Sequence, residues 1–170
     1  MSRWRRPAAI ALVGLVVATT CVLLGRWQWH RHVAKDAAIA TVERNWQAPA
    51  VPIEAVLRPG GTLTADQQWR TVTVTGRYEP PSTVLLRGRT VDGQGVYHVL
   101  VPFTAADGTV LVVDRGWIPA GDDPDSPSAV PAAPPGTVTL TGRLVLAEPS
   151  VSRPAPAAQV RSTAVRDVLA

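Results

Sequence analysis

An uncharged run of 19 residues near the N-terminus, Pro7–Gly25 (PAAIALVGLVVATTCVLLG), constrains this chain most strongly. At about 1.5 Å per residue, a helix of this length spans roughly 28 Å, close to the ~30 Å hydrocarbon core of a bilayer. Arginines lie on both sides of the run, with Trp4 before it and Trp27 and Trp29 after it, as in the aromatic belts of membrane helices. The run therefore predicts a transmembrane helix.

A cleaved signal peptide is the alternative for this run. Signal peptides have shorter apolar regions, of about 7–15 residues, that end in an A-x-A-like site. No such site follows Leu24, and the apolar run continues past Cys21, which argues against a lipoprotein site. The arginines before the helix favour a cytoplasmic N-terminus at residues 1–6. We therefore expect a single-pass protein of the cell (plasma) membrane whose main domain is extracytoplasmic.

The distribution of charge argues against a nucleic-acid-binding protein. The net charge is +4, but residues 1–35 hold six basic residues and no acidic one. Residues 36–170 hold the other eleven basic and all thirteen acidic residues, a net charge of −2, so the main domain has no basic excess to neutralise phosphates. The single cysteine, Cys21, excludes an intramolecular disulfide and a Cys₄ metal site.

The segment after the apolar run has no proline or glycine up to residue 48, so the helix is predicted to continue beyond the membrane surface. Pro49 and Pro52 end it, because a residue before proline is disfavoured in helical conformation. The predicted parts are a basic N-terminus (1–6), a transmembrane helix (7–25), a membrane-proximal helix (26–48), a β domain (49–150) and a C-terminal segment (151–170). Residues 161–170 are predicted to begin another helix.

Residues 49–150 have the alternation and β-branched content of strands. The predicted strands are Trp69–Tyr78, Thr83–Arg89, Gly95–Phe103, Thr109–Trp117 and Thr137–Leu146. Short connections favour antiparallel neighbours, and Asp107-Gly108 predicts a hairpin. The predicted fold class is mainly β, an antiparallel barrel or sandwich-like domain. A proline-rich loop at 119–136 has polyproline-II character and serves either as a connection or as a recognition motif.

Two of these strands carry nearly the same sequence, TVTVTGR at residues 71–77 and TVTLTGR at residues 137–143. A duplicated binding hairpin is one explanation of this repeat. The other is that both strands turn at a sheet edge, where Gly76 and Gly142 each mark a bulge or a sharp bend. We favour the second interpretation.

The residues that carry enzymatic chemistry are scarce, and the chain is predicted not to be an enzyme. The β domain has one histidine, His98, in a strand without a nucleophile elbow, which is typical of a structural histidine; a hydrolase using it stays an alternative. Phosphate-binding glycine loops and metal-ligand spacings do not occur in it. His30 and His32 would lie about 200° apart on a helix, so they cannot share a metal ion, but either can be an axial haem ligand.

Five motifs follow one another along the chain: GRWQWHR (25–31), WRTVTVTGRY (69–78), GVYHVLVP (95–102), DRGWIP (114–119) and VTLTGRL (138–144). In this order they resemble the motifs of the surfeit-locus-one family of cytochrome c oxidase assembly factors. The resemblance marks several motif or structural residues: Gly25, Trp27, Trp69, Gly76, Gly116 and Trp117. Asp114 stands where the family more often has Asn. Residues 1–170 are expected to lack the family's C-terminal part, with its second membrane helix and histidine.

The resemblance implies a membrane-anchored chaperone that assists haem a delivery or the maturation of cytochrome c oxidase subunit I. Subunit I, other assembly factors and the lipid bilayer are then its partners, and haem a its transient cofactor; no metal ion is expected. The candidate cofactor-binding residues are Gln28, His30, Arg31 and Arg115. Arginine can hold a propionate through two parallel hydrogen bonds. A structural interpretation stays open for each: interfacial anchoring for Gln28 and Arg31, a solvated interfacial side chain for His30, and an ion pair for Arg115.

The alternative function is a membrane-tethered extracytoplasmic β adaptor that binds an envelope protein without haem. Haem that co-purifies with the chain would separate the two functions.

Overall fold

The computed structural model describes residues 5–121, 129–151, 155–164 and 168–169 of the chain. The chain forms two compact units, Met1–Arg44 and Asn45–Ala170, and each is described by itself. In the described ranges, the first unit is helical and all the strands belong to the second. The predicted helix start at 161–170 falls partly on residues 165–167 and 170, which lie outside the described ranges.

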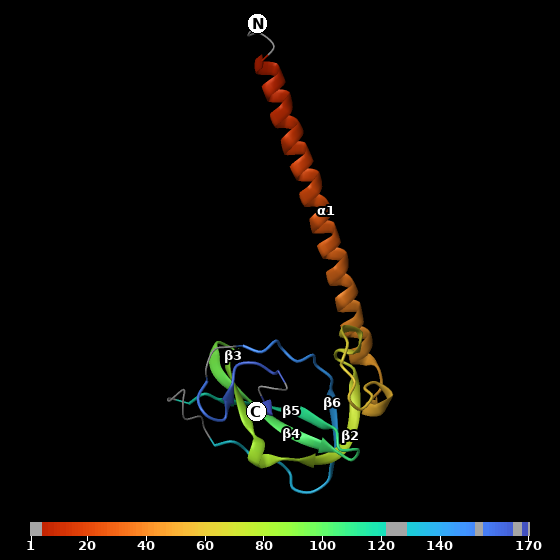
Figure 1. The fold of residues 1–170 in the computed structure, drawn as a ribbon, viewed down its shortest axis with the longest axis vertical. Coiled ribbons are helices and arrows are strands. Elements are labelled where there is room, and N and C mark those ends of the chain that lie inside the picture. Colours follow the sequence, from red (N-terminus) through yellow and green to blue (C-terminus); the bar gives the residue numbers. More distant parts are fainter. Residues whose placement is uncertain (1–4, 122–128, 152–154, 165–167, 170) are drawn as a thin grey trace. The chain divides into compact units, whose positions relative to one another are not determined.

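The first unit consists of one helix, α1 (Arg5–Gln47), whose last turn belongs to the second unit (Figure 1). Its 43 residues correspond to about 65 Å, twice the thickness of a bilayer core. The most apolar part has a mean hydropathy of 2.4 and is not buried within the protein. By length and composition α1 is therefore able to cross a membrane, and it continues without a break beyond the apolar run.

The last turn of α1 is held by side-chain hydrogen bonds inside the second unit. Asn45 is 8% exposed, and its amide donates to the carbonyl oxygens of Asp66 (2.6 Å) and Gln68 (2.8 Å). The helix ends at Gln47, just before the predicted proline stop, and Arg70 donates to the Pro49 carbonyl oxygen at 2.7 Å. A buried amide that donates to two carbonyls fixes this helix end to the segment just before Thr71.

The described residues of the second unit form seven strands: β1 (Val51–Pro52), β2 (Thr71–Tyr78), β3 (Val84–Val91), β4 (Gln94–Ala105), β5 (Val110–Pro119), β6 (Val138–Arg143) and β7 (Gln159–Val160). Short 3₁₀ helices are η1 (Ile53–Ala55), η2 (Ala65–Gln67) and η3 (Pro80–Ser82). The five long strands coincide with the five predicted runs. β1 and β7 were not predicted, because two residues are too few to show an alternating pattern.

All seven strands belong to one sheet with the order β1-β2-β4-β3-β7, in which β5 pairs with β4 and β6 with β2 (Figure 1). The prediction of a mainly β domain after one N-terminal helix is confirmed. Two details differ from it: β1–β2 and β3–β7 pair in parallel, so the sheet is mixed, and it does not close into a barrel. Both parallel pairs join segments far apart in sequence, where a short connection no longer forces antiparallel pairing.

The core consists of three clusters arranged along β4. The first lies between β2 and β4, around Phe103, which is fully buried. The second packs Leu85, Tyr97, Val99, Val101 and Ile118 together, and the third packs Leu86, Leu100, Val160 and Val168. Both faces of β4 are therefore covered, which explains its near-continuous apolar run.

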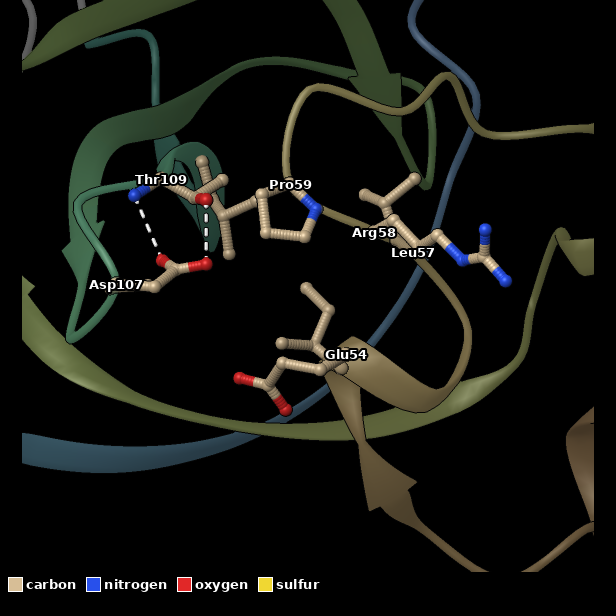
Figure 2. A pocket seen from close by; sticks show the side chains of 9 residues that line it. Glu54, Leu57, Arg58, Pro59, Asp107 and Thr109 are labelled. Carbon is tan, nitrogen blue, oxygen red and sulfur yellow. Dashed lines mark hydrogen bonds between the residues drawn. The ribbon is translucent and has the colours of Figure 1, made fainter.

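The predicted Asp107-Gly108 hairpin joins β4 to β5, with Gly108 at φ +85°. The Asp107 carboxylate accepts hydrogen bonds from the Thr109 backbone N–H and hydroxyl, both at 2.9 Å (Figure 2). These two donors, the backbone N–H first, lower the pKa of Asp107. The cavity of about 20 Å³ beside this turn has room for one water molecule and no larger ligand.

The two repeated sequences form strands that pair with each other. β2 and β6 are antiparallel in unbroken register, from Thr71 opposite Arg143 to Gly76 opposite Val138. The expected bulge at Gly76 or Gly142 is absent from this ladder, and the register shifts lie instead between Leu86 and Arg89 and between His98 and Leu100. Gly76 instead allows the β2 backbone to lie close to β4. A Cβ there would lie 2.6 Å from Phe103 Cε1 and closer still to the Thr104 carbonyl oxygen.

Candidate functional site

The predicted haem-binding residues of the first unit lie on one exposed stretch of α1. Gln28, His30 and Arg31 are all exposed, and Gln28 and Arg31 are three residues apart, so they share a side of the helix. The Arg31 guanidinium carbon lies 5.5 Å from the centre of the Trp27 ring, a cation–π distance. Gly25 precedes this stretch and has open space around it. The stretch thus exposes a cation and an amide on one side of the helix, and the imidazole of His30 about 200° from the amide.

The two histidines of α1 differ in their surroundings. His32 lies 3.3 Å from the Asp36 carboxylate and makes an edge-on contact with Trp29. His30 has no such partner among the residues that the structure describes, and its ring is exposed. Of the two imidazoles, His30 is therefore the one that an external ligand meets without displacing a partner.

The fourth candidate, Arg115, belongs to β5 in the second unit and makes its contacts there. Its terminal nitrogens donate to the carbonyl oxygens of Pro131 (2.8 Å) and Ala132 (3.1 Å), and its guanidinium lies 5.5 Å from the Tyr78 ring centre. These contacts replace the expected ion pair and tie the proline-rich segment to β5. Among the described residues, Arg115 is also the one charged residue lining a groove of about 360 Å³, whose other lining residues are Pro80, Thr83, Leu85, Val130, Pro131, Ala132, Ala133 and Ala158.

Gly116 and Trp117 lie at the bulge where the β4–β5 register shifts. Gly116 has φ +101°, a conformation that side chains with a Cβ rarely adopt, and its N–H donates to Asp114 Oδ1 at 2.8 Å. Trp117 is 51% exposed rather than packed in the core. Gly116 therefore has a structural role, and the bulge presents an indole at the surface.

The bulge also joins two side chains that the sequence did not connect, His98 and Asp114. The His98 Nδ1 atom lies 2.8 Å from Asp114 Oδ2, while the other carboxylate oxygen accepts the Gly116 N–H. The pair is partly open to solvent, with 28% of the His98 and 46% of the Asp114 side chain exposed. Only the strand register with its bulge brings them together, so no spacing in the sequence could have revealed the pair.

Trp69 packs against the last turn of α1 together with Arg143. Its backbone has φ +67°, unusual for a bulky residue, and its ring centre lies 6.1 Å from that of Trp46. The Arg143 guanidinium carbon lies 3.5 Å from the Trp46 ring centre. Trp46, Arg143 and Asn45 were not singled out from the sequence. A tryptophan and an asparagine in the last turn of the helix could have indicated that this turn packs against the β domain.

The described residues include exposed side chains that can bind a ligand. No group of three or more His, Cys, Asp or Glu that could hold a metal ion occurs within the described ranges. The two exposed sets that can meet a ligand are the Gln28–Arg31 stretch of α1 and the His98–Asp114 pair beside Trp117.

Comparison with known proteins identifies the family. The sequence model of the SURF1 family matches residues 15–169. The chain belongs to the SURF1 family. Its motifs from Gly25 to the strand β6 all lie within the matched range, and the predicted resemblance is thereby confirmed. No solved structure matches the chain significantly.

Several curated relatives are similar over most of the chain. An uncharacterized SURF1-like protein of Mycobacterium tuberculosis is 35% identical over 150 residues, which cover 86% of this chain and 55% of the relative. A SURF1-like protein of Rickettsia felis is 28% identical, covering 62% and 45%. The yeast cytochrome oxidase assembly protein SHY1 is 27% identical over 110 residues, 63% of this chain and 28% of SHY1. The chain spans about half the length of the first of these relatives.

Proposed function

We propose that this SURF1 family chain is a membrane-anchored assembly factor of cytochrome c oxidase that holds haem a transiently while subunit I matures. The observation that carries the proposal is the family match over residues 15–169, together with the oxidase assembly role in the name of yeast SHY1. The binding groups on the surface of α1 support a role in holding a ligand, without covalent chemistry.

The residues of α1 fit the chemistry of haem. A haem takes an axial protein ligand for its iron, in many proteins a histidine nitrogen, and cations or hydrogen-bond donors for its two propionates. His30 offers an exposed imidazole, and Arg31, the next residue, offers a cation for a propionate. Gln28 shares the side of Arg31 but lies about 200° from His30 around the helix, so it cannot hold the same haem on the side of His30. Arg115 already donates from both terminal nitrogens to backbone carbonyls, so we assign it to positioning the proline-rich segment rather than to a propionate.

We further propose that α1 crosses the cell membrane with the second unit outside the cytoplasm. The long apolar helix and the arginines before it support this orientation. A reporter that is active only in the cytoplasm, fused after Ala50, is expected to be inactive. Activity of that reporter would reverse the orientation.

The test of haem binding is purification of the full chain in detergent from a host that makes haem a. The expected result is a Soret band in the purified protein and haem a in its pyridine haemochrome spectrum. His30→Ala is expected to lower the haem content strongly, and His32→Ala, the matched control, to leave it unchanged. A chain without haem that co-purifies with an envelope protein would overturn the proposal in favour of the adaptor function.

A further inference from the structure

We propose that Trp27, Arg31 and Lys35 of α1 form a binding site for the phosphate of an anionic phospholipid headgroup. The inference rests on the proposed crossing of the membrane by α1, and it goes further because it assigns the class of lipid and the residues that select it. The three residues follow one another at a spacing of four, so they lie along one line on the helix surface. All three are exposed.

The side chain of Arg31 is directed back along the helix toward the apolar run. Its guanidinium carbon lies 5.5 Å from the centre of the Trp27 ring, which is one turn closer to Gly25. A guanidinium over the face of an indole keeps the N–H donors in its own plane, and such donors bind phosphate oxygens in pairs. The contact with Trp27 therefore holds Arg31 in a conformation that suits a phosphate group.

This line of residues lies at the depth of the lipid headgroups. The apolar run ends at Gly25, and at about 1.5 Å per residue Trp27 lies roughly 3 Å and Arg31 roughly 9 Å beyond it. The headgroup layer on each side of a bilayer is roughly 5–8 Å thick, so a guanidinium directed back over Trp27 falls within it. Lys35 lies one turn farther out, within a Debye length of the phosphates, and long cationic side chains lean toward this layer.

The charge of this stretch favours an anionic lipid over a zwitterionic one. Residues 26–35 contain three basic residues and no acidic residue. The first carboxylate that follows, Asp36, lies 3.3 Å from His32. Within the described ranges, none of the ion pairs involves Arg31 or Lys35. A zwitterionic headgroup carries an ammonium of its own, which these cations repel, whereas a basic segment beside the membrane attracts anionic lipids.

Arg31 also belongs to the proposed haem site, and one guanidinium holds either a lipid phosphate or a propionate at a given time. Lys35 and Trp27 have no part in the haem proposal. The two proposals are therefore tested separately, with a Lys35 variant for the lipid and a His30 variant for the haem.

The test is quenching of Trp27 fluorescence by brominated lipids, in the full chain reconstituted into phosphatidylcholine vesicles. The contribution of Trp27 is obtained by subtracting the signal of the matching Trp27→Phe variant. Brominated phosphatidylglycerol is expected to quench Trp27 at a lower mole fraction than brominated phosphatidylcholine does. Lys35→Gln and Arg31→Gln should each reduce this preference roughly fivefold. The control Arg44→Gln, roughly 20 Å farther along the helix than Arg31, should leave it unchanged, as should His30→Ala.

The outcomes separate this inference from the proposed function. Equal quenching by the two lipids overturns the inference and leaves the proposed function intact. If neither lipid quenches Trp27, the residue does not lie at the membrane surface, and the proposed crossing of α1 is overturned as well. Arg26 lies at the same depth but about 100° from Trp27 around the helix. A loss of preference in Arg26→Gln as large as in Lys35→Gln would mean a general attraction by charge without a site, and the inference would be wrong.

Discussion

The strands β2 and β6 carry nearly the same sequence and pair with each other, yet they meet different surroundings. β2 lies between β6 on one side and β1 and β4 on the other, and three of its residues are buried. β6 pairs only with β2 among the described strands, and none of its residues is buried. Each position of the repeat can therefore be compared in an interior and an edge strand.

At equivalent positions of the repeat, the same residue type has different neighbours and therefore a different structural role. Gly76 faces the core and the β4 backbone, whereas Gly142 has open space around its Cα. The repeat ends in Arg77, which pairs with Glu79 near the surface, and in Arg143, which packs over Trp46. The following substitutions at equivalent positions test these differences, each by urea unfolding of the full chain in detergent.

The largest difference is expected between Gly76→Ala and Gly142→Ala. A Cβ at Gly76 would lie 2.6 Å from Phe103 Cε1 and 2.8 Å from Ala105 Cα, so β2 and β4 must separate. We expect a loss of about 3 kcal/mol in the free energy of unfolding for Gly76→Ala. Gly142→Ala should change it by less than about 0.5 kcal/mol. Equal losses would show that the two glycines serve the same purpose.

The next difference is expected between Val72→Ala and Val138→Ala. Val72 is 3% exposed in the first core cluster, and Val138 only packs against the edge of that cluster. Removing two buried methyl groups costs about 2 kcal/mol, including the cavity that remains. For the half-buried Val138 we expect less than about 1 kcal/mol. A larger loss at Val138 would mean that β6 is covered by another part of the protein.

For the arginines we expect the opposite order: the substitution in the edge strand β6 should cost more stability than the one in β2. Arg143 lies 3.5 Å over the Trp46 ring, whereas the side chain of Arg77 is 69% exposed and pairs with Glu79. We expect Arg143→Ala to cost about 1 kcal/mol and to change the tryptophan emission, because it removes a cation–π contact. Arg77→Ala should cost less than about 0.5 kcal/mol, as for exposed ion pairs. An unchanged emission spectrum in Arg143→Ala would contradict the contact.

How far the sequence predicts this fold depends on the range of the interactions involved. The long strands and the Asp107-Gly108 hairpin follow from alternation and turn chemistry, which are local, and the structure has them within a few residues. The parallel strands β1 and β7 are two residues each and exist only through pairing with distant segments. Such pairing leaves no periodic signal in the sequence.

The candidate site shows the same limit. The Gln28–Arg31 stretch is predictable because helix geometry alone places its side chains. The partners of Arg115 are two backbone carbonyls of the proline-rich segment, which no residue pattern reveals. The His98–Asp114 pair depends on a register shift between β4 and β5, so the sequence left His98 as an ordinary strand residue.

The smallest expected effect concerns the threonines that join the two repeated strands. The hydroxyls of Thr75 and Thr139 lie 2.8 Å apart across the β2–β6 ladder, and both are exposed. A double-mutant cycle with Thr75→Val and Thr139→Val should give a coupling of about 0.5 kcal/mol, because cross-strand hydroxyl pairs at a surface contribute little. Valine keeps the β-branched shape, so the cycle isolates the hydrogen bond. A coupling near zero would mean that water replaces this bond and that the register rests on the apolar face of β6 alone.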